Sequence, residues 1–341
     1  MTQRFLVTGG AGYVGSHLVA ALLDRGDDVV VLDSLRTGHR AAVLPGARLV
    51  ELDLADAPAV DALLADGPWE AVFHFASLSL VGESMRLPFR YLAENGVNAI
   101  RLIESCVRHG VPRFVLSSTA NLFGAPETVP IPETARIDPG SPYGESKWMI
   151  ERALLWAEQI HGLRSARLRY FNAAGADPAG RLGEDHDPET HLIPLVIDAA
   201  LGRRPPVEVF GTDYPTSDGT CIRDYVHVTD LANAHLLALT KLADASVTWN
   251  LGNGAGHSVL AVIRAVERVA ARNVPHRLGA RRPGDPAVLV AGAEAALSAG
   301  WQPTFAALDD IVRTALAWRE SHPGGYAGPL PERARPSSGA R

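Results

Sequence analysis

A tyrosine and a lysine four residues apart, Tyr143 and Lys147, are the clearest candidates for acid–base chemistry. They lie in the segment Ser-Pro-Tyr-Gly-Glu-Ser-Lys, in which Ser141 can cap a helix and Pro142 suits its first position. Residues at i and i+4 share one helix face, so we expect the ammonium of Lys147 beside the phenol of Tyr143. That charge would lower the phenol pKa from about 10 and make Tyr143 a base near neutral pH. An ordinary surface pair is the alternative.

Three hydroxyl residues, Ser117 to Thr119, end an apolar run that begins at Phe114. A hydroxyl at the end of such a strand could share a substrate proton with Tyr143. It could equally hydrogen-bond to the backbone at the end of the strand. The residues themselves do not choose one hydroxyl among the three.

Glycines at 9, 12 and 15 lie in the segment Thr-Gly-Gly-Ala-Gly-Tyr-Val-Gly, between an apolar strand pattern and a helix pattern. Gly9 permits a tight turn, Gly12 lets the backbone approach a pyrophosphate, and Gly15 lets the helix pack closely on the strand. The N–H groups at the start of the helix then face the anion. A glycine motif alone is weak evidence, but here it occupies the first strand-to-helix turn, where dinucleotide binding requires it.

An acidic residue, Asp33, ends the second apolar run, where a dinucleotide fold binds the adenosine ribose. Its carboxylate can accept hydrogen bonds from the ribose hydroxyls and would repel a 2′-phosphate. The sequence therefore predicts NAD as the cofactor rather than NADP, although Arg36 lies close enough to complicate that preference.

Two further strand ends are expected to contact the cofactor. Asp53 and Leu54 follow the third run and would flank the adenine, while Asp53 could also cap the next helix. The backbone of Phe75, Ala76 and Ser77 follows the fourth run and would approach the middle of the cofactor.

Short apolar runs alternate with amphipathic stretches through the first half of the chain. Runs this uniformly apolar fit strands buried on both faces, as in a parallel sheet. The alternation predicts an α/β fold with a Rossmann-like doubly wound parallel sheet. We expect strands at 5–8, 29–32, 49–52, 71–75, 114–117 and 166–171, the last closing the domain, and helices at 14–25, 57–64, 88–109 and 142–161.

The texture changes after residue 172 to loops rich in Gly, Pro and Asp, with helix patterns near 192–201, 230–242, 259–271 and 308–321. We therefore predict an NAD-binding Rossmann domain over 1–172, completed by part of 220–242. A smaller C-terminal α/β substrate domain is expected over 173–325. The end of the chain, 326–341, is rich in Pro, Gly, Ser and Arg and is expected to be a flexible tail.

The composition is that of a globular enzyme, with 47% hydrophobic and 21% charged residues. A net charge of -6 without a basic run argues against a nucleic-acid partner. Two cysteines exclude a disulfide scaffold and a Cys-rich zinc site. No apolar stretch is long enough for a membrane span, and the N-terminal residues do not form a signal peptide pattern, so a cytoplasmic protein is predicted.

Two helix patterns carry more apolar residues than one sheet face needs. The excess could be additional sheet-packing core, or it could pair across a two-fold axis to form a homodimer, which we predict. The residues concerned are Ile100, Leu102, Ile103 and Val107 on the first helix, and Met149, Ile150, Leu154, Leu155 and Trp156 on the second.

Other chemistries find less support. The chain has no Gly-x-Ser-x-Gly nucleophile elbow and no phosphate-binding loop of the P-loop type. His186 and His191 lie among acids, which would allow a metal site. We interpret this segment as a solvated lid beside the substrate and predict no metal.

Together these motifs resemble those of the extended short-chain dehydrogenase/reductases, and within them the UDP-glucose 4-epimerase family. The similarity extends from Val7 to about Tyr326. The segments that carry it are Val7–His17, His74–Ser84, Ser141–Lys147, Leu168–Gly175, Arg281–Asp285 and, most specifically, Phe210–His227.

The resemblance implies roles for individual residues. Thr119 matches the family's catalytic Ser/Thr, which completes a catalytic set of Thr119, Tyr143 and Lys147. The implied NAD-binding residues are Gly9, Gly12, Tyr13, Val14, Gly15, Asp33, Ser34, Thr37, Gly38, Asp53, Leu54, Phe75, Ala76, Ser77, Asn95, Ser117, Tyr143, Lys147 and Tyr170. The implied substrate-binding residues are Thr119, Tyr143, Phe171, Asn172, His191, Leu192, Phe210, Arg223, Tyr225, Arg282 and Asp285.

The arginines among these residues fit a diphosphate, because a chain with a negative total charge must bind it through local arginine forks. Without a substrate, Arg223 could instead form an ion pair with Asp224 or Asp230, and Arg282 could be a solvated loop charge.

The resemblance implies an NAD-dependent isomerase that interconverts UDP-glucose and UDP-galactose through a transient 4-keto sugar. Alternatives are an epimerase for UDP-GlcNAc/GalNAc or UDP-xylose/arabinose, a 4,6-dehydratase, and a non-catalytic NAD-binding regulator. A dehydratase is disfavoured because Ala120 and Asn121 follow Thr119, where that chemistry uses an Asp-Glu pair. Ser79, Glu94 and Asn121 depart from the family pattern, and Leu289 lies where some members carry a large Tyr that limits sugar size.

Overall fold

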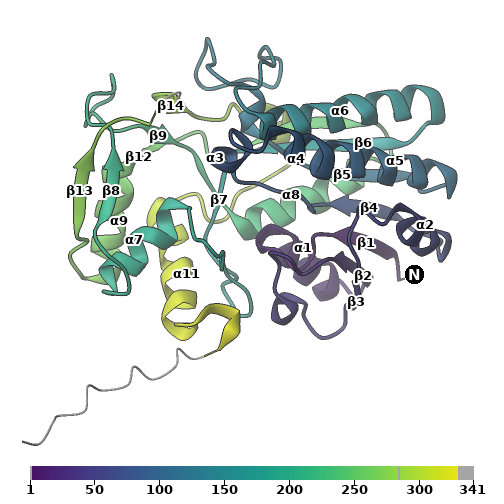
Figure 1. Ribbon diagram of the computed structural model, residues 1–341, viewed down its shortest axis with the longest axis horizontal. Coiled ribbons are helices and arrows are strands. Elements are labelled where there is room, and N and C mark those ends of the chain that lie inside the picture. Colours follow the sequence, from purple (N-terminus) through teal and green to yellow (C-terminus); the bar gives the residue numbers. More distant parts are fainter. Residues whose placement is uncertain (1, 283–284, 329–341) are drawn as a thin grey trace, which may run out of the picture.

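The computed structural model describes residues 2–282 and 285–328 of the 341-residue chain. Its larger part is a seven-stranded, wholly parallel sheet with the order β11-β6-β5-β4-β1-β2-β3 (Figure 1). The reversal of chain order at β1 and β4 is that of a doubly wound Rossmann-like sheet, which confirms the predicted fold class. The strands are β1 Arg4–Thr8, β2 Asp28–Asp33, β3 Arg48–Glu51, β4 Ala71–His74, β5 Arg113–Thr119, β6 Arg164–Tyr170 and β11 Val247–Leu251.

Strand β11 corrects the expectation that residues 166–171 close the sheet. It pairs in parallel with β6 and places Trp249 beside Leu168, so β11 is the edge strand. Helix α8, Val228–Lys241, precedes it and packs on the same sheet. The segment that completes the sheet therefore extends past residue 242. Its short run, Val-Thr-Trp-Asn-Leu, does not by itself identify a partner strand.

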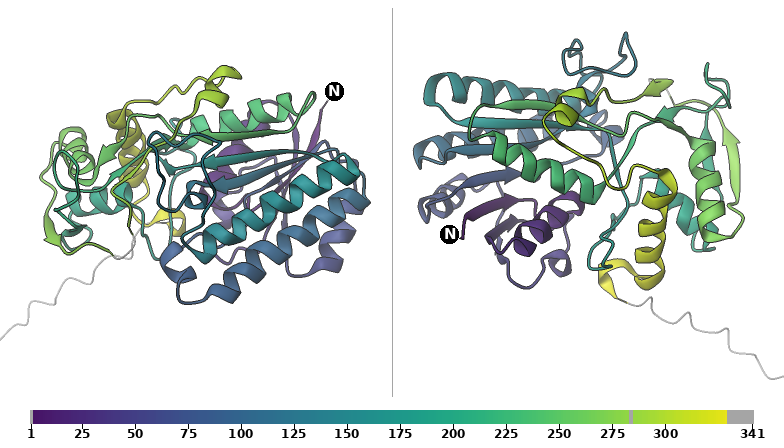
Figure 2. Two further views of the ribbon diagram at one scale, coloured as in Figure 1. Left: turned by 90° about the horizontal axis from the view of Figure 1, so that it is seen from above. Right: turned by 180° about the vertical axis from the view of Figure 1, so that it is seen from behind.

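Helices cover both faces of the sheet, as the two views of Figure 2 show. On one face α2 Ala57–Ala65, α5 Asn98–Arg108 and α6 Pro142–His161 bury their apolar stripes against β-strand residues such as Val72 and Leu116. On the other face α1 Tyr13–Asp24 packs with α8. Because both faces are covered, the strands are apolar on both sides, as the sequence predicted.

The helix expected over 88–109 is interrupted. It begins as α4 Pro88–Tyr91, widens into a π-helical segment at Leu92–Val97, and continues as α5. Such π segments occur mostly at functional sites. Here the π segment contains Asn95, one of the predicted cofactor-binding residues.

The smaller part of the molecule is built on three helices, α7 Leu192–Ala200, α9 Val259–Ala270 and α11 Leu308–Ser321, which enclose a separate apolar core (Figure 1). Short strands surround them: β7 Asn172–Ala174 pairs with β10 Tyr225–His227, β8 Val207–Phe210 with β13 His276–Gly279, and β9 Ile222–Arg223 with β12 His257–Ser258 and β14 Val288–Leu289. The remaining short helices are α3 Val81–Ser84 and α10 Glu294–Ser298, with 3₁₀ turns at Arg40–Ala42, Ala120–Leu122 and Gly325–Ala327.

The described end of the chain does not behave as the start of a flexible tail. The hydroxyl of Tyr326 accepts a hydrogen bond from the amide of Gly183 at 3.0 Å, and the backbone amide of Tyr326 donates to the carboxylate of Asp185 at 2.8 Å. The Tyr326 ring also lies against His39. These contacts correct the prediction for 326–328, and residues 329–341 lie outside the described part.

The two apolar helix faces divide between core and surface. Leu102, Ile103, Ile150 and Leu154 are buried in the sheet-packing core. In contrast, three other residues on α6 remain exposed: Leu155 by 45%, Trp156 by 54% and Ile160 by 65%. We call these three the α6 stripe. Among the described residues, no helix combines the length and apolarity required to cross a membrane.

Candidate active site

Tyr143 lies in the first turn of α6, which begins as the sequence predicts. The hydroxyl of Ser141 accepts a hydrogen bond from the amide of Gly144 at 3.1 Å, and Pro142 occupies the first helical position. The cap fixes the start of the helix at the carboxyl end of β5, where Thr119 is the last strand residue. The side chain of Thr119 lies near the phenol of Tyr143 and acts to lower the pKa of that phenol, so these two predicted residues meet.

Lys147 is buried, with 1% of the residue exposed, and its ammonium donates to the carbonyl of Ser117 at 2.9 Å. Burial lowers the pKa of Lys147 to about 7. Burial also raises the pKa of Tyr143 to about 12, against which the side chain of Thr119 acts. This corrects the expectation that Lys147 lowers the pKa of Tyr143. Lys147 binds the strand backbone, and desolvation dominates both groups in the chain alone.

Two polar contacts hold this site between neighbouring elements. The hydroxyls of Ser117 and Tyr170, at the ends of β5 and β6, share a hydrogen bond. Asn95 exchanges hydrogen bonds with the backbone of Leu78 at 2.8 and 2.9 Å and donates to Ser146 on α6 at 3.1 Å. Ser146 was not identified from the sequence, because its role follows from the approach of the π segment to α6.

The glycine turn has the geometry of a dinucleotide cradle. Gly9 has a φ of +73°, and a Cβ there would meet the amide of Ala76 at 2.4 Å. A Cβ on Gly15 would meet the carbonyl of Gly9 at 2.2 Å, whereas one on Gly12 would approach only that carbonyl, at 3.3 Å. Gly12 therefore has free space in the direction in which a Cβ would project, apart from this one contact. Because α1 begins there without a side-chain cap, the first helical N–H groups, those of Tyr13 and Val14, are available for an anion.

The end of β2 has the charge pattern expected for NAD. Asp33 is 8% exposed and accepts hydrogen bonds from the amides of Ala11 at 3.0 Å and Leu35 at 2.9 Å. Arg36, which complicated the choice between NAD and NADP, forms an ion pair with Glu94. Glu94 is one of the departures from the family pattern, and it occupies the guanidinium that a 2′-phosphate would need.

The other predicted cofactor residues occupy loops at the same edge of the sheet. Asp53 does not cap α2, since it accepts from the amide of Ala55 at 2.9 Å, while Asp56 caps the helix through Ala59. Phe75, which follows β4, lies against the ring of His235 with 4.9 Å between ring centroids. The remaining residues of this group are Ser34, Thr37 and Gly38 after β2, Leu54 after β3, and Ala76 and Ser77 after β4.

The predicted diphosphate-binding residues come together across the smaller part of the molecule. Arg223 forms an ion pair with Asp285, and the guanidinium of Arg282 lies 4.0 Å from the centroid of the Phe210 ring. The alternative for Arg223 does not hold, whereas Arg282 is an exposed loop residue, as its alternative supposed. The carboxylates of Asp224 and Asp230 accept backbone amides, from Asn253, Gly254 and Ala291 and from Thr304 and Phe305 respectively, rather than pairing with Arg223.

Strand β7 links the two halves of the site. It starts at Asn172, directly after Phe171, and Asn172 donates from its side chain to the carbonyl of Asp224 at 2.8 Å. Its partner β10 begins at Tyr225, which is buried. The predicted substrate residues of this region thus follow the carboxyl end of β6, adjacent to Tyr170.

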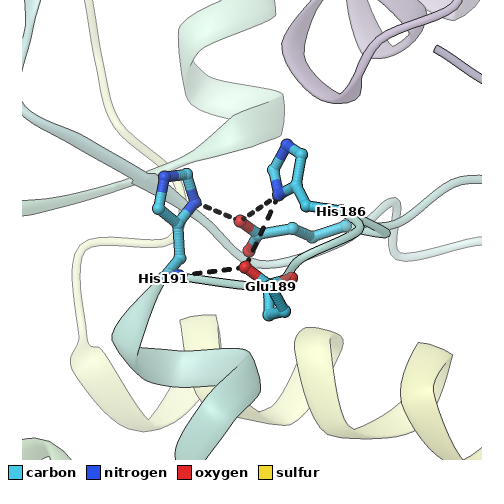
Figure 3. Close-up of side chains that lie close together, drawn as sticks. His186, Glu189 and His191 are labelled. Atoms are coloured by element: carbon cyan, nitrogen blue, oxygen red, sulfur yellow. Dashed lines mark hydrogen bonds and ion pairs between the residues drawn. The ribbon is translucent and has the colours of Figure 1, made fainter. Parts of the chain in front are cut away.

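The segment before α7 has exposed residues, as the interpretation as a solvated lid supposed, but a buried carboxylate anchors its two histidines. His191 is the residue before α7, and Leu192 is the first residue of that helix. Glu184, 6% exposed, contacts both His186 and His191, and Glu189 lies beside them (Figure 3). The predicted substrate residue His191 therefore has a buried partner, Glu184, that the sequence did not single out. A buried acid has no local sequence signal.

Residues 5–252 match the model of the NAD dependent epimerase/dehydratase family. The chain belongs to this family. Its members' dependence on NAD agrees with the cradle around Gly12 and with the carboxylate of Asp33, which fit a dinucleotide that lacks a 2′-phosphate.

Individual members of the NAD dependent epimerase/dehydratase family are similar over nearly the whole chain. A UDP-glucose 4-epimerase from Azospirillum brasilense is 50% identical over 323 residues, which cover 94% of this chain and 93% of that protein. A crystal structure of a UDP-glucose 4-epimerase is 45% identical with a TM-score of 0.92, covering 95% of this chain and 99% of the other. The Brucella ovis UDP-glucose 4-epimerase in complex with NAD is 42% identical with a TM-score of 0.90, covering 93% and 98%.

Proposed function

We propose that this epimerase-family chain interconverts UDP-glucose and UDP-galactose by inverting the configuration at C4 of the sugar. The observation that carries the proposal is that Thr119, Tyr143 and the buried Lys147, which donates to the carbonyl of Ser117, gather at the same edge of the sheet as the glycine cradle. Ligands of doubly wound sheets bind outside the carboxyl ends of the strands, at the switch in strand order. The similarity to enzymes named UDP-glucose 4-epimerase supports this substrate class.

In this mechanism Tyr143 takes the proton of the sugar C4 hydroxyl, directly or through Thr119. NAD, when bound, would supply the hydride acceptor and donor for C4 and a positive charge in the site. Without it, burial outweighs the effect of Thr119 and raises the pKa of Tyr143 to about 12. Lys147 fixes the ribose side of the site, and its hydrogen bond to the carbonyl of Ser117 keeps the lysine in place.

Epimerisation requires a firm hold on UDP and a loose hold on the sugar, because both faces of the 4-keto sugar must meet the same hydride donor. The predicted residues divide in this way. Arg223 and Arg282 are oriented by Asp285 and Phe210, which suits bidentate binding of a diphosphate. NAD is regenerated in each turnover, so we propose that the protein retains it as a prosthetic group.

The test is an assay without added cofactor. We expect the purified protein to convert UDP-glucose to UDP-galactose, and the reverse, and to release NAD on denaturation. Turnover of only UDP-GlcNAc or UDP-xylose would replace the substrate but keep the reaction. Loss of water from a dTDP-sugar would indicate a dehydratase, and bound NAD without turnover would indicate a regulator.

A homodimer and a cytoplasmic location are further parts of the proposal. The α6 stripe supports the dimer, because Leu155, Trp156 and Ile160 form an exposed apolar face on the long helix beside α5, where Ile100 is 38% exposed. Two such faces related by a two-fold axis would cover each other.

Trp156→Glu is expected to separate the dimer into monomers in sedimentation velocity. Central interface aromatics contribute about 2 kcal/mol or more, so the dimer dissociation constant should rise by roughly 30-fold or more. Leu297→Glu, which changes an exposed apolar residue on α10, is the matched control and should leave the dimer intact. A wild-type protein that sediments as a monomer at micromolar concentration would refute the dimer.

A further inference from the structure

The segment between β7 and α7 contains a cluster of two histidines and two glutamates that the proposed reaction does not explain. The candidate ligand atoms of Glu184, His186, Glu189 and His191 all lie within 4.8 Å of one another. In Figure 3, dashed lines join the imidazoles of His186 and His191 to the same carboxylate oxygen, which belongs to Glu184. The Nδ1 atoms of both histidines contact one oxygen, Oε1 of Glu184, at 3.3 Å in the case of His186.

The cluster lies between the cofactor and substrate halves of the proposed site. The ring of His186 packs edge-on against Tyr13, with 6.0 Å between centroids, and Tyr13 is the first residue of α1 after the glycine cradle. His191 immediately precedes α7 on the other side. The hydroxyl of Tyr13 donates to the carbonyl of Gly175 at 2.7 Å, which ties the same region to the loop after β7.

A divalent metal ion is the first alternative for such a group, but the existing contacts oppose it. Glu184 is already shared by both imidazoles, and Oε1 of Glu189 accepts the amides of Thr190 and His191 at 2.8 and 2.9 Å. The other oxygen of Glu189 lies 3.4 Å from Arg319. A metal would have to displace the histidine protons and the arginine, whereas two imidazolium ions balance the two carboxylates without a further ion.

The charges within the cluster favour the protonated imidazoles. Partial desolvation of the half-exposed His191 ring lowers its pKa, but the charge of Glu184 and the hydrogen bond to it outweigh this and raise that pKa. The pKa of His186 is raised to about 10 in the same way, against burial, by Glu184 and Glu189. The pKa of Glu184 itself is lowered to about 2, since His191 and His186 outweigh its burial. Arg319 also faces this group, through Glu189.

We propose that Glu184 is a positioning residue that holds His191 as a cation whose Nε2–H donates to the diphosphate of the substrate. This rests on the proposed function and deepens it. With Nδ1 bonded to Glu184, Nε2 is the remaining donor of the ring, and no hydrogen bond within the described chain uses it. The half-exposed His191 side chain, 49%, leaves that nitrogen accessible. The partial positive charge at the start of α7 adds to the attraction for an anion.

The proposal is tested by UDP-glucose binding in Glu184→Gln at two pH values, measured by calorimetry. Without the carboxylate, the pKa of His191 should fall towards its ordinary value of about 6.5. The ratio of variant to wild-type Kd should therefore be near one at about pH 5.8, where His191 is charged in both proteins. The ratio should increase, towards about tenfold, as the pH rises to about 8, because Glu184 raises the pKa of His191 and the wild type therefore keeps the charge-assisted hydrogen bond to a higher pH than the variant. Binding is measured apart from turnover, so failure of the proposed reaction would be seen separately.

Asp187→Asn is the matched control, because it removes an exposed acid of the same segment, and we expect a ratio near one at both pH values. A ratio for Glu184→Gln that is equal at both pH values would show a merely structural role and overturn the proposal.

If Glu184→Gln does not fold, His191→Gln gives the answer. The binding of UDP-glucose to His191→Gln should be weaker than wild type at the lower pH as well, because a glutamine carries no charge at either pH. Unchanged binding in His191→Gln, or stoichiometric Zn²⁺ binding that strengthens UDP-glucose binding, would also overturn the assignment.

Discussion

Tyr143→Phe is expected to lower kcat by about 10²- to 10⁴-fold, the usual contribution of a positioned general acid–base. The substitution removes the phenol oxygen alone, and the aromatic ring stays between Thr119 and the start of α6. NAD content and UDP binding should therefore persist, because the groups proposed to bind them are unchanged. The measurement is kcat for UDP-galactose formation, with NAD quantified after denaturation.

A second tyrosine provides the control for loss of a buried phenol. Tyr91 is fully buried and donates to Glu83 at 2.8 Å, and it does not belong to the proposed catalytic set. Tyr91→Phe should retain kcat even where it reduces stability. If Tyr143→Phe kept near wild-type kcat, Tyr143 would lose its assigned role, and the mechanism would need another base.

Arg169→Met is expected to destabilise the protein by about 3–5 kcal/mol, because it leaves a buried carboxylate unpaired. Arg169 on β6 donates to Glu151 on α6 at 2.6 Å, with side-chain exposures of 6% and 1%. Among the described residues, Ser118 would then be the one side chain still bonded to Glu151, at 2.6 Å. This ion pair joins the catalytic helix to the sheet, so its loss should also disturb the position of Tyr143. The measurement is the shift of the urea unfolding midpoint.

The contrast between buried and exposed pairs checks this explanation. Arg268→Met breaks an ion pair in which the side chains of Arg268 and Asp309 are 58% and 39% exposed. This variant should lower the free energy of unfolding by no more than about 1 kcal/mol. Changing both partners, Arg169→Met with Glu151→Gln, should recover part of the lost stability, because no unpaired charge remains buried. Equal effects of the two single arginine variants would refute the role given to burial.

Local patterns were enough to predict the framework of the site. The glycine turn, the acid at the end of β2, and the start of α6 at Ser141 and Pro142 were each predicted at the correct position. These features depend on backbone conformation and capping within a few residues, which short sequence segments encode directly. The buried parallel strands were predictable for the same reason, since their apolar runs reflect burial on both faces.

Pairings between distant segments were not predictable in this way. The edge strand β11 joins β6 across 81 residues, judged from the hydrogen bond of Arg167 to Thr248. Arg223 pairs with Asp285 rather than with its sequence neighbour Asp224. From the sequence, a neighbouring acid was the expected ion-pair partner of Arg223. In the fold, however, the carboxylate of Asp224 accepts hydrogen bonds from backbone amides of segments distant in sequence.

Residue types and spacing predicted the residues able to do the chemistry and the strand or helix end that carries each of them. The charges of these residues depend on contacts that the folded chain alone provides. Burial raises the pKa of Tyr143 and lowers that of Lys147, whereas Glu184 raises the pKa of His191. Local spacing determines the backbone position from which a side chain projects. Desolvation and ion pairing depend on segments distant in sequence, and these two effects set the energy of each protonation state.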